Sequence, residues 1–563
     1  MSGLPPFAIF LVAGLLAAVT RGPLRAALML ATPLVSAWTL LGLEPGTQIT
    51  VSLMGLELVL MRVDGLSLLF GWLFHLGAFI GILYALHVRD GMQQVTSMLY
   101  AGSAVGAAFA GDLVTFFLFW ETLAVTSVFL IWASRTPAAI KAGIRYLVLQ
   151  VGSGVTLLAG ILMYAHGTGG IAFDEIGLDA PGGLLIFLGL GLKCGFPLLH
   201  MWLTDAYPEA TPTGSVFLCM FTTKVAIAAL ARGFPGTEAL IYIGTAMTFF
   251  PIYFAVIEND LRRVLAYSMI NQLGFMVCGI GLGTALALNG AVSHAFNDVL
   301  FKGLLFMSMG AVLTMTGRSK ASDLGGLYKT MPITATLCII GACTISAIPL
   351  FAGFVSKSMV MQAALNEGHT IIWLFLLFAS VGVLEHAGIK IPFFAFFAHD
   401  SGLRPGEPPI NMLLAMGIAA VLCVVIGTWP GATLYPLLPY DASYEPYDMT
   451  HVIVQLQLLM FGALAVFWMM RTGRYPTEER AINLDADWLY RRLLPAWIRA
   501  GGRALTPLRE GWSRMLEARG KDLMTFLTRH HGMSGTLART WPIGSMALWV
   551  AILLALFVVA YYV

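Results

Sequence analysis

The chain has 563 residues, of which 58% are hydrophobic and only 11% charged, and its formal net charge is +2. Soluble domains usually carry about a quarter charged residues, so the composition excludes a soluble protein and predicts a chain built largely inside a lipid bilayer. The net charge itself says nothing about nucleic acid, because the distribution of charge along the chain matters more than its sum.

Apolar runs in chain order predict about sixteen membrane-spanning helices, since a span needs ~20 apolar residues. We expect spans at about 5–20, 25–43, 64–87, 95–110, 113–133, 140–165, 183–203, 212–231, 237–257, 264–283, 286–315, 332–366 (interrupted), 371–397, 410–430, 451–470 and 542–563. The stretch 47–64 alternates in polarity and predicts a short extracellular hairpin.

Charge in the loops predicts the orientation of the spans. The first basic residues, Arg21 and Arg25, follow the first apolar run, which indicates an uncleaved span with its N-terminus outside. Most later loops keep the same bias, basic inside and acidic outside. The inner loop that holds Asp205 and Glu209 is an exception, and we expect it to pack against protein.

Charged residues inside apolar runs are the strongest functional signal in this sequence. A charge at mid-membrane costs at least ~2.5–3.5 kcal/mol, so it is by default a functional hypothesis. The lysines concerned form two pairs of similar spacing: Lys193 with Lys224, and Lys357 with Lys390. Repeated broken segments in corresponding halves of a chain indicate the ion path of a transporter. The sequence therefore predicts an ion-translocating membrane protein.

The first lysine of each pair lies close to residues that interrupt helices. We expect Pro197 to break the seventh span, and Pro349 and Gly353 to break the twelfth. Spans four to eight and nine to thirteen would form two five-helix units, and because five is odd the second unit enters the membrane inverted. The predicted fold class is an all-α polytopic membrane protein with about 14–16 transmembrane helices, two inverted five-helix repeats and broken helices 7 and 12.

The predicted domain boundaries follow from this pattern. Helices 1–4 would occupy residues 1–110, and the rest of the first repeat would run from 111 to 235. The second repeat would cover 236–400, followed by peripheral helices at 401–470. Residues 471–540 are rich in Lys and Arg, with interleaved tryptophans, and predict an amphipathic segment on the inner membrane surface. The last span would lie at 541–563, and because spans bracket the basic segment we expect no nucleic-acid partner.

Several motifs resemble one family of membrane proteins. They are DLVTFFLFWETLAVTSVFLI (112–131), GLGLKCGFPLLHMWLTDAYPEATPTGS (189–215), ENDLRRVLAYSMINQLGFM (258–276), SHAFNDVLFKGLLF (293–306) and LFAGFVSKSMV (350–360). The chain resembles the antiporter-like subunits shared by respiratory complex I, membrane-bound hydrogenases and the multisubunit Mrp Na⁺/H⁺ antiporter, most closely the D-type subunits of Mrp. The resemblance implies fourteen core helices around a hydrated polar axis, in a bacterial inner (plasma) membrane.

The resemblance also implies roles for individual residues on a proton path. It implies that Glu121 pairs with Lys193 as a gate, that Lys224 connects the halves, and that His294, Lys302 and Lys357 continue the path. Lys390 is added by repeat symmetry. Many relatives have a second histidine where this chain has Asp298. Because Asp298 lies one helical turn from both His294 and Lys302, we expect it to pair with one of them.

Each of these residues also has a structural interpretation. The Glu121–Lys193 pair would then be a tether between helices, Lys302 would reach the membrane interface, and His294 would be a satisfied core histidine. Asp298 would cap a helix or face a polar interface. His200 and His386 are interpreted as structural residues, and the six cysteines as packing residues.

No cofactor, metal or catalytic motif is present in the sequence, so the expected protein is a transporter subunit without chemistry of its own. The first hypothesis is a proton-translocating subunit of a multisubunit cation (Na⁺)/H⁺ antiporter. The alternative is a proton-conducting subunit of a redox-driven complex, or of a gradient-driven uptake system such as one for inorganic carbon. Expected partners are other membrane subunits, H⁺ with Na⁺ or K⁺, and the lipid bilayer. A membrane scaffold without transport is the third hypothesis.

Overall fold

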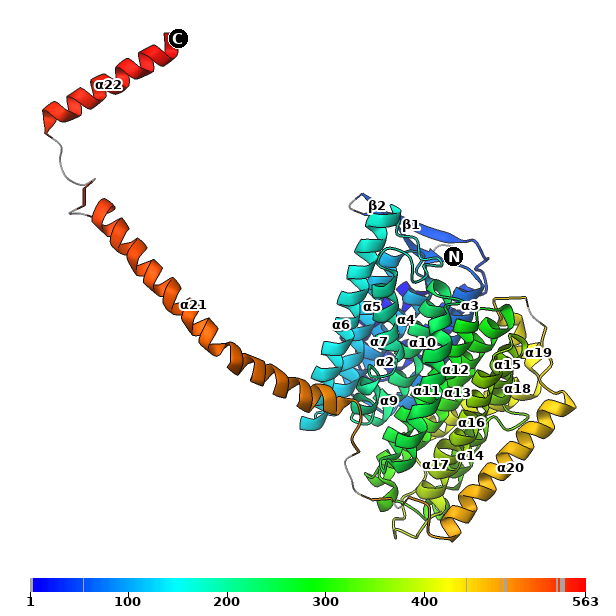
Figure 1. Ribbon diagram of the computed structural model, residues 1–563. Coiled ribbons are helices and arrows are strands. Elements are labelled where there is room, and N and C mark those ends of the chain that lie inside the picture. The colour runs from blue at the N-terminus through cyan, green and yellow to red at the C-terminus, as the bar shows by residue number, and fades with distance from the viewer. Residues whose placement is uncertain are drawn as a thin grey trace. The chain divides into compact units, whose positions relative to one another are not determined.

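The computed structural model describes residues 4–53, 55–441, 443–476, 478–479, 483–532, 535–536 and 542–562. Contacts within the chain divide it into two units, Met1–Asn483 and Leu484–Val563. The first unit contains all the residues that the sequence places on a proton path. Its helices form a bundle with a hairpin at one end (Figure 1).

The helices of the first unit follow the apolar runs of the sequence. They are α1 (Pro6–Val19), α2 (Gly22–Leu40), α3 (Gly65–Ala85), α4 (Gly91–Phe109), α5 (Leu113–Trp132), α6 (Pro137–Thr168), α7 (Gly183–Cys194), α8 (Met201–Ala206), α9 (Pro212–Met220), α10 (Thr222–Gly233), α11 (Glu238–Ile257), α12 (Leu261–Leu282), α13 (Ala285–Thr316), α14 (Pro332–Ile345), α15 (Ala352–Asn366), α16 (Thr370–Val383), α17 (Lys390–Pro392), α18 (Ile410–Thr428), α19 (Pro430–Thr433) and α20 (Met449–Arg471). Short 3₁₀ turns are η1 (Ala321–Asp323), η2 (Leu327–Lys329) and η5 (Tyr435–Leu437). Wider π turns, η3 (Leu384–Ile389) and η4 (Phe393–Phe397), flank α17.

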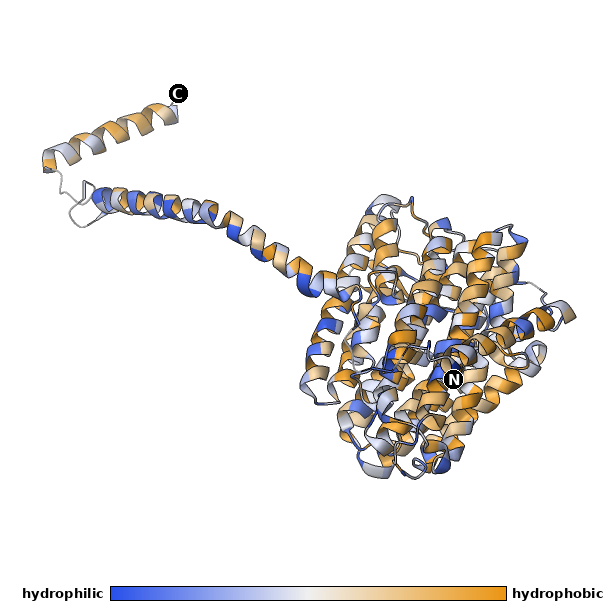
Figure 2. Ribbon diagram, turned by 60° about the horizontal axis from the view of Figure 1, so that its bottom comes forward, coloured by the Kyte–Doolittle hydropathy of each residue, from blue (hydrophilic) through white to orange (hydrophobic). Residues whose placement is uncertain are grey.

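These elements confirm the predicted all-α polytopic class. Within the described residues, 11 helical segments are long and apolar enough to cross a membrane, and α1, α7 and α14 are shorter apolar helices. Each predicted span coincides with one helix or with consecutive helices. Figure 2 shows the first unit as mostly hydrophobic ribbon, as a bilayer requires. The inverted relation between two five-helix repeats stays a prediction.

The predicted hairpin is present. Strands β1 (Gln48–Leu53) and β2 (Leu56–Arg62) pair antiparallel, and Gly55 between them has a φ of 82° that favours glycine. The hairpin also holds the start of α5, because the backbone N–H of Val59 donates to the carboxylate of Asp112 at 2.7 Å. Asp112 caps α5 by accepting from the backbone of Val114 and Thr115, which fixes where the glutamate-bearing helix begins.

Both predicted helix breaks are present, but one of their assigned residues is wrong. The first break lies between α7 and α8, where Leu198 next to Pro197 has a φ of 70°. The second lies between α14 and α15 and contains Pro349. Gly353 does not break a helix, since it lies in the first turn of α15. A Cβ there would be 2.0 Å from the carbonyl oxygen of Thr344, so glycine permits close packing of α15 on α14.

A third interruption was not predicted. The span expected at 212–231 is divided into α9 and α10 at Phe221, whose backbone departs from regular helix with φ −113° and ψ −68°. The hydroxyl of Tyr100 accepts the backbone N–H of Thr222 at 3.1 Å and contacts its Oγ1 at 2.6 Å. Tyr100 thereby satisfies polar groups that the interruption frees inside the bundle.

The loop with Asp205 and Glu209 packs against protein, as expected, whereas its location on the inner side stays a prediction. Arg145 forms two hydrogen bonds with the Asp205 carboxylate, at 2.7 and 2.9 Å. The guanidinium of Arg262 donates to carbonyl oxygens of the same loop, including that of Ala210 at 2.8 Å. Arginines therefore hold the loop against the bundle, and one of them pairs with the Asp205 carboxylate.

The second unit is described by itself. It contains the π turn η6 (Leu489–Leu493), the 38-residue helix α21 (Leu494–His531) and the apolar helix α22 (Ile543–Tyr562). Polar and apolar residues alternate along α21 in Figure 2, whereas α22 is mostly hydrophobic. The predicted basic segment thus contains one long amphipathic helix, although part of it (477, 480–482, 533–534 and 537–540) lies outside the described residues.

Candidate functional site

The four lysines of the two predicted pairs are all fully buried, and each donates to backbone carbonyl oxygens. The Lys193 ammonium donates to the carbonyl oxygen of Trp120 at 2.6 Å, and the Lys224 ammonium to that of Cys219 at 2.9 Å. The Lys357 ammonium donates to the carbonyl oxygen of Ile345 at 2.7 Å. The Lys390 ammonium donates to the carbonyl oxygens of Val256 and Glu258, at 2.6 and 2.7 Å. Three of the four lysines, Lys224, Lys357 and Lys390, contact carbonyls beside an interruption or a helix end. The helix breaks therefore solvate Lys224 and Lys357, and a helix C-terminus solvates Lys390.

The predicted gate residues are neighbours, but they do not form an ion pair in this structure. Lys193 donates to the carbonyl oxygen of Trp120 and lies 4.1 Å from the centre of its indole ring. Within the described residues, the buried Oε1 of Glu121 has no hydrogen-bond partner. The expected Glu121–Lys193 contact is thus open, with the ammonium held one residue away along α5.

Gly154 on α6 makes room for the Glu121 carboxylate. A Cβ at Gly154 would lie 1.6 Å from Oε1 of Glu121, closer than any non-bonded contact allows. At Gly152, two residues earlier on the same helix, a Cβ would meet nothing within 4 Å. Sequence reasoning missed Gly154, because its role depends on which face of α6 meets α5.

Gly154→Ala is expected to displace the Glu121 carboxylate and to lower transport by roughly ten-fold or more, since misplacement of a reacting group by ~1 Å can cost ~10²-fold. Gly152→Ala is the matched control, because it adds the same methyl group to the same helix in open space. Ion exchange in membrane vesicles, normalised to the amount of protein, measures both. Equal rates in the two variants would show that the position of Glu121 does not matter.

The predicted pairing of Asp298 is wrong. The carboxylate of Asp298 forms an ion pair with Lys224 at 2.5 Å, and both side chains are fully buried. Its neighbours on α13 use other partners: Lys302 donates to Ser268 at 2.7 Å, and His294 contacts Ser356 and Gln272. Asp298 has a short side chain, and the long Lys224 side chain reaches it from α10 across the helix interface.

His294 connects α13 to the helices on either side. Its Nδ1 lies 2.9 Å from the hydroxyl of Ser356 on α15, and its Nε2 lies 3.1 Å from Oε1 of Gln272 on α12. Asn297 also donates to Ser356, at 3.1 Å. Ser356 precedes Lys357, so polar contacts reach the second broken helix. Gln272 and Ser356 were missed, although Gln272 stands out as an amide in the apolar run of 264–283.

Lys390 lies apart from these contacts. Besides the carbonyls at the end of α11, its ammonium forms an ion pair with Oε1 of Glu478 at 2.9 Å. Within the described residues, the hydrogen bonds and the ion pair of Lys390 do not join it to Lys357 or to His294. The structure thus brings most predicted site residues together around α13, and places Lys390 at the end of α11.

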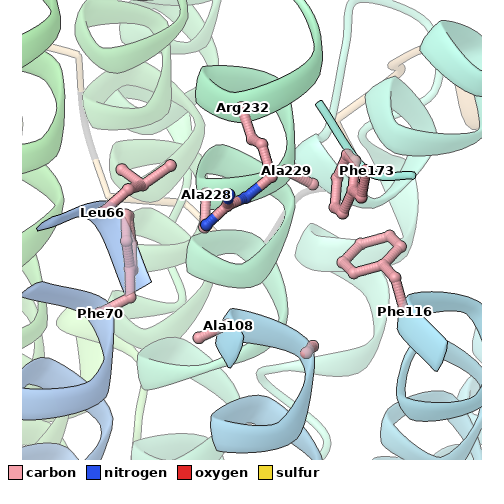
Figure 3. Close-up of a pocket in the computed structure, with 9 residues that line it drawn as sticks. Leu66, Phe70, Ala108, Phe116, Phe173, Ala228, Ala229 and Arg232 are labelled. Carbon is pink, nitrogen blue, oxygen red and sulfur yellow. The ribbon is translucent and has the colours of Figure 1, made fainter. Parts of the chain in front are cut away.

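A small cavity near the hairpin is not a candidate site. It is lined mainly by apolar side chains, among them Phe70, Phe116 and Phe173, with Arg232 as its one charged lining residue (Figure 3). Arg232 is already bound by the Asp64 carboxylate through two hydrogen bonds, at 2.6 and 3.0 Å. Among the described residues, no group of three or more His, Cys, Asp or Glu side chains suits a metal ion.

A bundle of apolar helices that encloses several buried lysines, the buried Asp298 and the buried His294 is typical of a polytopic membrane protein of the antiporter-like class. Comparison with known families agrees with this class. Residues 110–382, just under half of the chain, match the family model described as "NADH:quinone oxidoreductase/Mrp antiporter, TM". The match confirms the resemblance found in the motifs, whereas nothing in it singles out the D-type subunits of Mrp.

Two curated relatives are antiporter subunits. The chain is 29% identical over 507 residues to the A/B subunit of a probable K⁺/H⁺ antiporter of Rhizobium meliloti (strain 1021), covering 82% of this chain and 49% of the relative. It is 28% identical over 421 residues to the A1 subunit of the Na⁺/H⁺ antiporter of Staphylococcus haemolyticus (strain JCSC1435), covering 66% of this chain and 52% of the relative. The chain therefore spans about half the length of these curated relatives.

A solved structure supports the same class. A chain in the structure of the Mrp complex from Dietzia sp. DQ12-45-1b superposes with a TM-score of 0.76 at 25% identity. The superposition covers 93% of this chain and 62% of the other. The bundle described above is thus the fold of an antiporter-like subunit.

Proposed function

We propose that this chain is a proton-translocating subunit of a multisubunit cation/proton antiporter in the bacterial plasma membrane. The Lys224–Asp298 ion pair is the observation that carries the proposal, because two fully buried charges are costly and persist in membrane spans mainly for transport. Lys193 belongs to α7, whereas Lys302 and His294 belong to α13 and Lys357 to α15. The residues supply titratable groups from α7 to α15 within one chain.

Opening and closing of one ion pair would move the proton. At ~4 Å and an effective dielectric constant of ~20, a lysine and a glutamate attract each other by ~4 kcal/mol. A closed Glu121–Lys193 pair would keep the proton on Lys193. In the open arrangement seen here, that attraction is weakened, and Lys193 can pass its proton toward Lys224 through water on the path. Asp298 then favours the proton on Lys224 until the next step.

Exposure of the first helices supports an assembly of several subunits. Glu121 is partly exposed, and so are large apolar side chains beside it on α5 and beside Gly154 on α6: Leu118 is 51% and Val155 63% exposed. A carboxylate facing lipid is very costly, so we propose that a neighbouring subunit covers α5 and α6 beside Glu121. The amphipathic helix α21 is proposed to lie on the inner membrane surface and to brace a neighbouring subunit there.

The exchanged cation is proposed to be Na⁺. The two relatives are named for K⁺ in one case and Na⁺ in the other, so both ions belong in the test. The second candidate function is proton conduction in a redox-driven complex, which is favoured by the NADH:quinone oxidoreductase subunits included in the matching family.

Everted membrane vesicles that contain the complete set of partner subunits test this proposal. A proton gradient is imposed, and Na⁺ or K⁺ is then added while the internal pH is followed. We expect Na⁺ to collapse the gradient in vesicles with the wild-type chain, and not in vesicles lacking it. An assembled complex that responds to neither cation, but acidifies vesicles when an electron donor is supplied, would replace the antiporter by the redox function.

A further inference from the structure

The first unit ends in a segment that places a carboxylate against a buried lysine. Glu478 follows α20, and its Oε1 forms the ion pair with Lys390 at 2.9 Å. The Glu478 side chain is only 8% exposed, and that of Lys390 is fully buried. Beyond this ion pair, neither carboxylate oxygen of Glu478 has a hydrogen-bond partner within the described residues.

Helix capping accounts for Lys390 but not for Glu478. The ammonium of Lys390 donates to the carbonyls of Val256 and Glu258 at the C-terminus of α11, where a cation is favourable. These carbonyls already solvate the ammonium. A buried carboxylate with one oxygen unpartnered lowers stability, so fixing this helix end does not explain why Glu478 is present.

A second buried titratable group lies near Lys390. His386 is fully buried on η3, and neither of its ring nitrogens makes a hydrogen bond of normal geometry within the described residues, although the backbone of Gly382 acts on the ring. The charges that act on its ring belong to Lys302, Lys357 and Lys390, which are all members of the proposed path. Irregular π turns such as η3 often occur at functional sites.

Packing connects η3 to the second helix break. A Cβ at Gly388 would lie 2.2 Å from Oγ of Ser346, so η3 lies directly against the end of α14. The residue before Ser346 is Ile345, whose carbonyl oxygen holds the ammonium of Lys357. η3 thus packs against the break that holds Lys357, and His386 on η3 is within electrostatic reach of Lys302 and Lys357 as well as of Lys390.

We propose that protons leave the proposed path near Lys302 and Lys357 through His386 and Lys390 and exchange with water at Glu478. This inference rests on the proposed transport function. The ammonium of Lys390 first gives a proton to the Glu478 carboxylate, and the resulting carboxylic acid releases it to water. His386, which has accepted a proton at one ring nitrogen, then releases a proton from the other to the neutral amine of Lys390, and the imidazole ring turns to restore its original tautomer. Only protons move, and after this turn each residue is back in its starting form.

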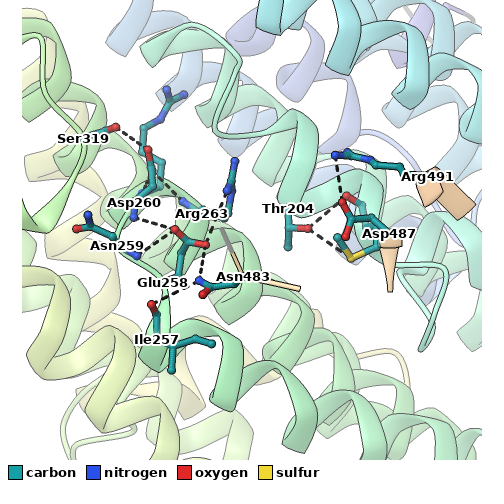
Figure 4. Close-up of polar contacts among 12 residues, drawn as sticks. Thr204, Ile257, Glu258, Asn259, Asp260, Arg263, Ser319, Asn483, Asp487 and Arg491 are labelled. Carbon is teal, nitrogen blue, oxygen red and sulfur yellow. Dashed lines mark hydrogen bonds and ion pairs between the residues drawn. The ribbon is translucent and has the colours of Figure 1, made fainter. Parts of the chain in front are cut away.

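The surroundings of Glu478 single it out among nearby carboxylates. Lys390, Glu258 and Tyr475 face it, and Glu385 lies beside Tyr475. Glu258 is fixed, because it accepts from the backbone of Asn259 and Asp260 and from the side chain of Asn483 (Figure 4). Burial raises the pKa of Glu478 and the Lys390 charge lowers it less, so its net pKa is above the usual range. A carboxyl with a raised pKa exchanges protons closer to neutral pH.

Glu478→Gln tests the inference in vesicles that contain the complete complex. Glutamine keeps the shape of the side chain and an oxygen toward Lys390, but it cannot take a proton. We expect cation/proton exchange per assembled complex to fall by about ten-fold or more at neutral pH. His386→Gln should show a similar loss. Glu479→Gln, a change at the adjacent exposed carboxylate, is the matched control and should exchange at the wild-type rate.

The pH dependence separates proton exchange from a structural role. Glu478→Asp keeps a titratable group at a different depth, so it should retain exchange with a displaced pH profile. Glu478→Asp also tests the inference if Glu478→Gln fails to assemble, since a wild-type pH dependence of exchange in Glu478→Asp would contradict proton exchange at Glu478. Wild-type exchange in Glu478→Gln and His386→Gln, beside an inactive Lys193→Ala, would overturn this route and leave the proposed function standing. Wild-type exchange in Glu478→Gln, His386→Gln and Lys193→Ala alike would overturn both this route and the proposed function.

Discussion

Lys193→Ala is expected to abolish cation/proton exchange while leaving the amount of assembled complex nearly unchanged. Lys193 is fully buried and is held by one hydrogen bond to the carbonyl of Trp120 and by the Trp120 ring. Replacing a buried lysine removes a desolvation cost of at least ~2.5–3.5 kcal/mol, so the bundle loses little stability. It also removes the group that would receive the proton beside Glu121.

Exchange in vesicles of equal protein content measures this effect. Lys141→Ala is the matched control, because Lys141 is exposed on α6 and its loss should leave exchange unchanged. A Lys193→Ala complex that assembles and exchanges like Lys141→Ala would remove Lys193 from the path.

Asp298→Leu is expected to abolish exchange and also to destabilise the protein. The change leaves the Lys224 ammonium buried without its counter-charge, and breaking a buried pair in this way typically costs about 3–5 kcal/mol. Lys224→Met combined with Asp298→Leu removes both charges, so we expect the thermal stability of the complex to recover. Exchange should stay absent, because the middle of the path would contain no titratable pair.

Thermal unfolding and exchange of the single and double variants separate stability from transport. A double variant that regains both wild-type thermal stability and wild-type exchange would show that the Lys224–Asp298 pair is a structural tether. Asp298→Asn adds a milder case, since the amide keeps a polar contact with Lys224 but carries no charge. It should lose exchange with a smaller loss of stability than Asp298→Leu.

Most of the fold was predictable from local sequence signals. A span is a continuous apolar run, and each predicted run became a helix or consecutive helices. The breaks at Pro197 and Pro349 were predictable because proline removes a helical hydrogen bond. The interruption at Phe221 carries no such local signal, since it depends on Tyr100 of another helix. Gly353 was misassigned for the same reason, because glycine is needed there for close packing against Thr344 of another helix and not for a turn.

The candidate site was predictable in its residues but not in its contacts. Buried lysines can be identified from sequence because charge in an apolar run is rare. The partner of Asp298 could not, because spacing along α13 indicates which residues share a face and not which neighbouring helix faces them. Gly154 and Glu478 were missed because each acts across an interface between segments far apart in the sequence.

The central claim, one proton path that continues from the first broken helix to the second, is tested most directly by Lys357→Ala. Proton flux through the complete complex in vesicles should fall as far as it does in Lys193→Ala, because Lys357, held at the Ile345 carbonyl, is the lysine of the proposed path that lies at the second break. Wild-type proton flux in an assembled Lys357→Ala complex, beside an inactive Lys193→Ala complex, would contradict the claim and show that protons leave before the second break.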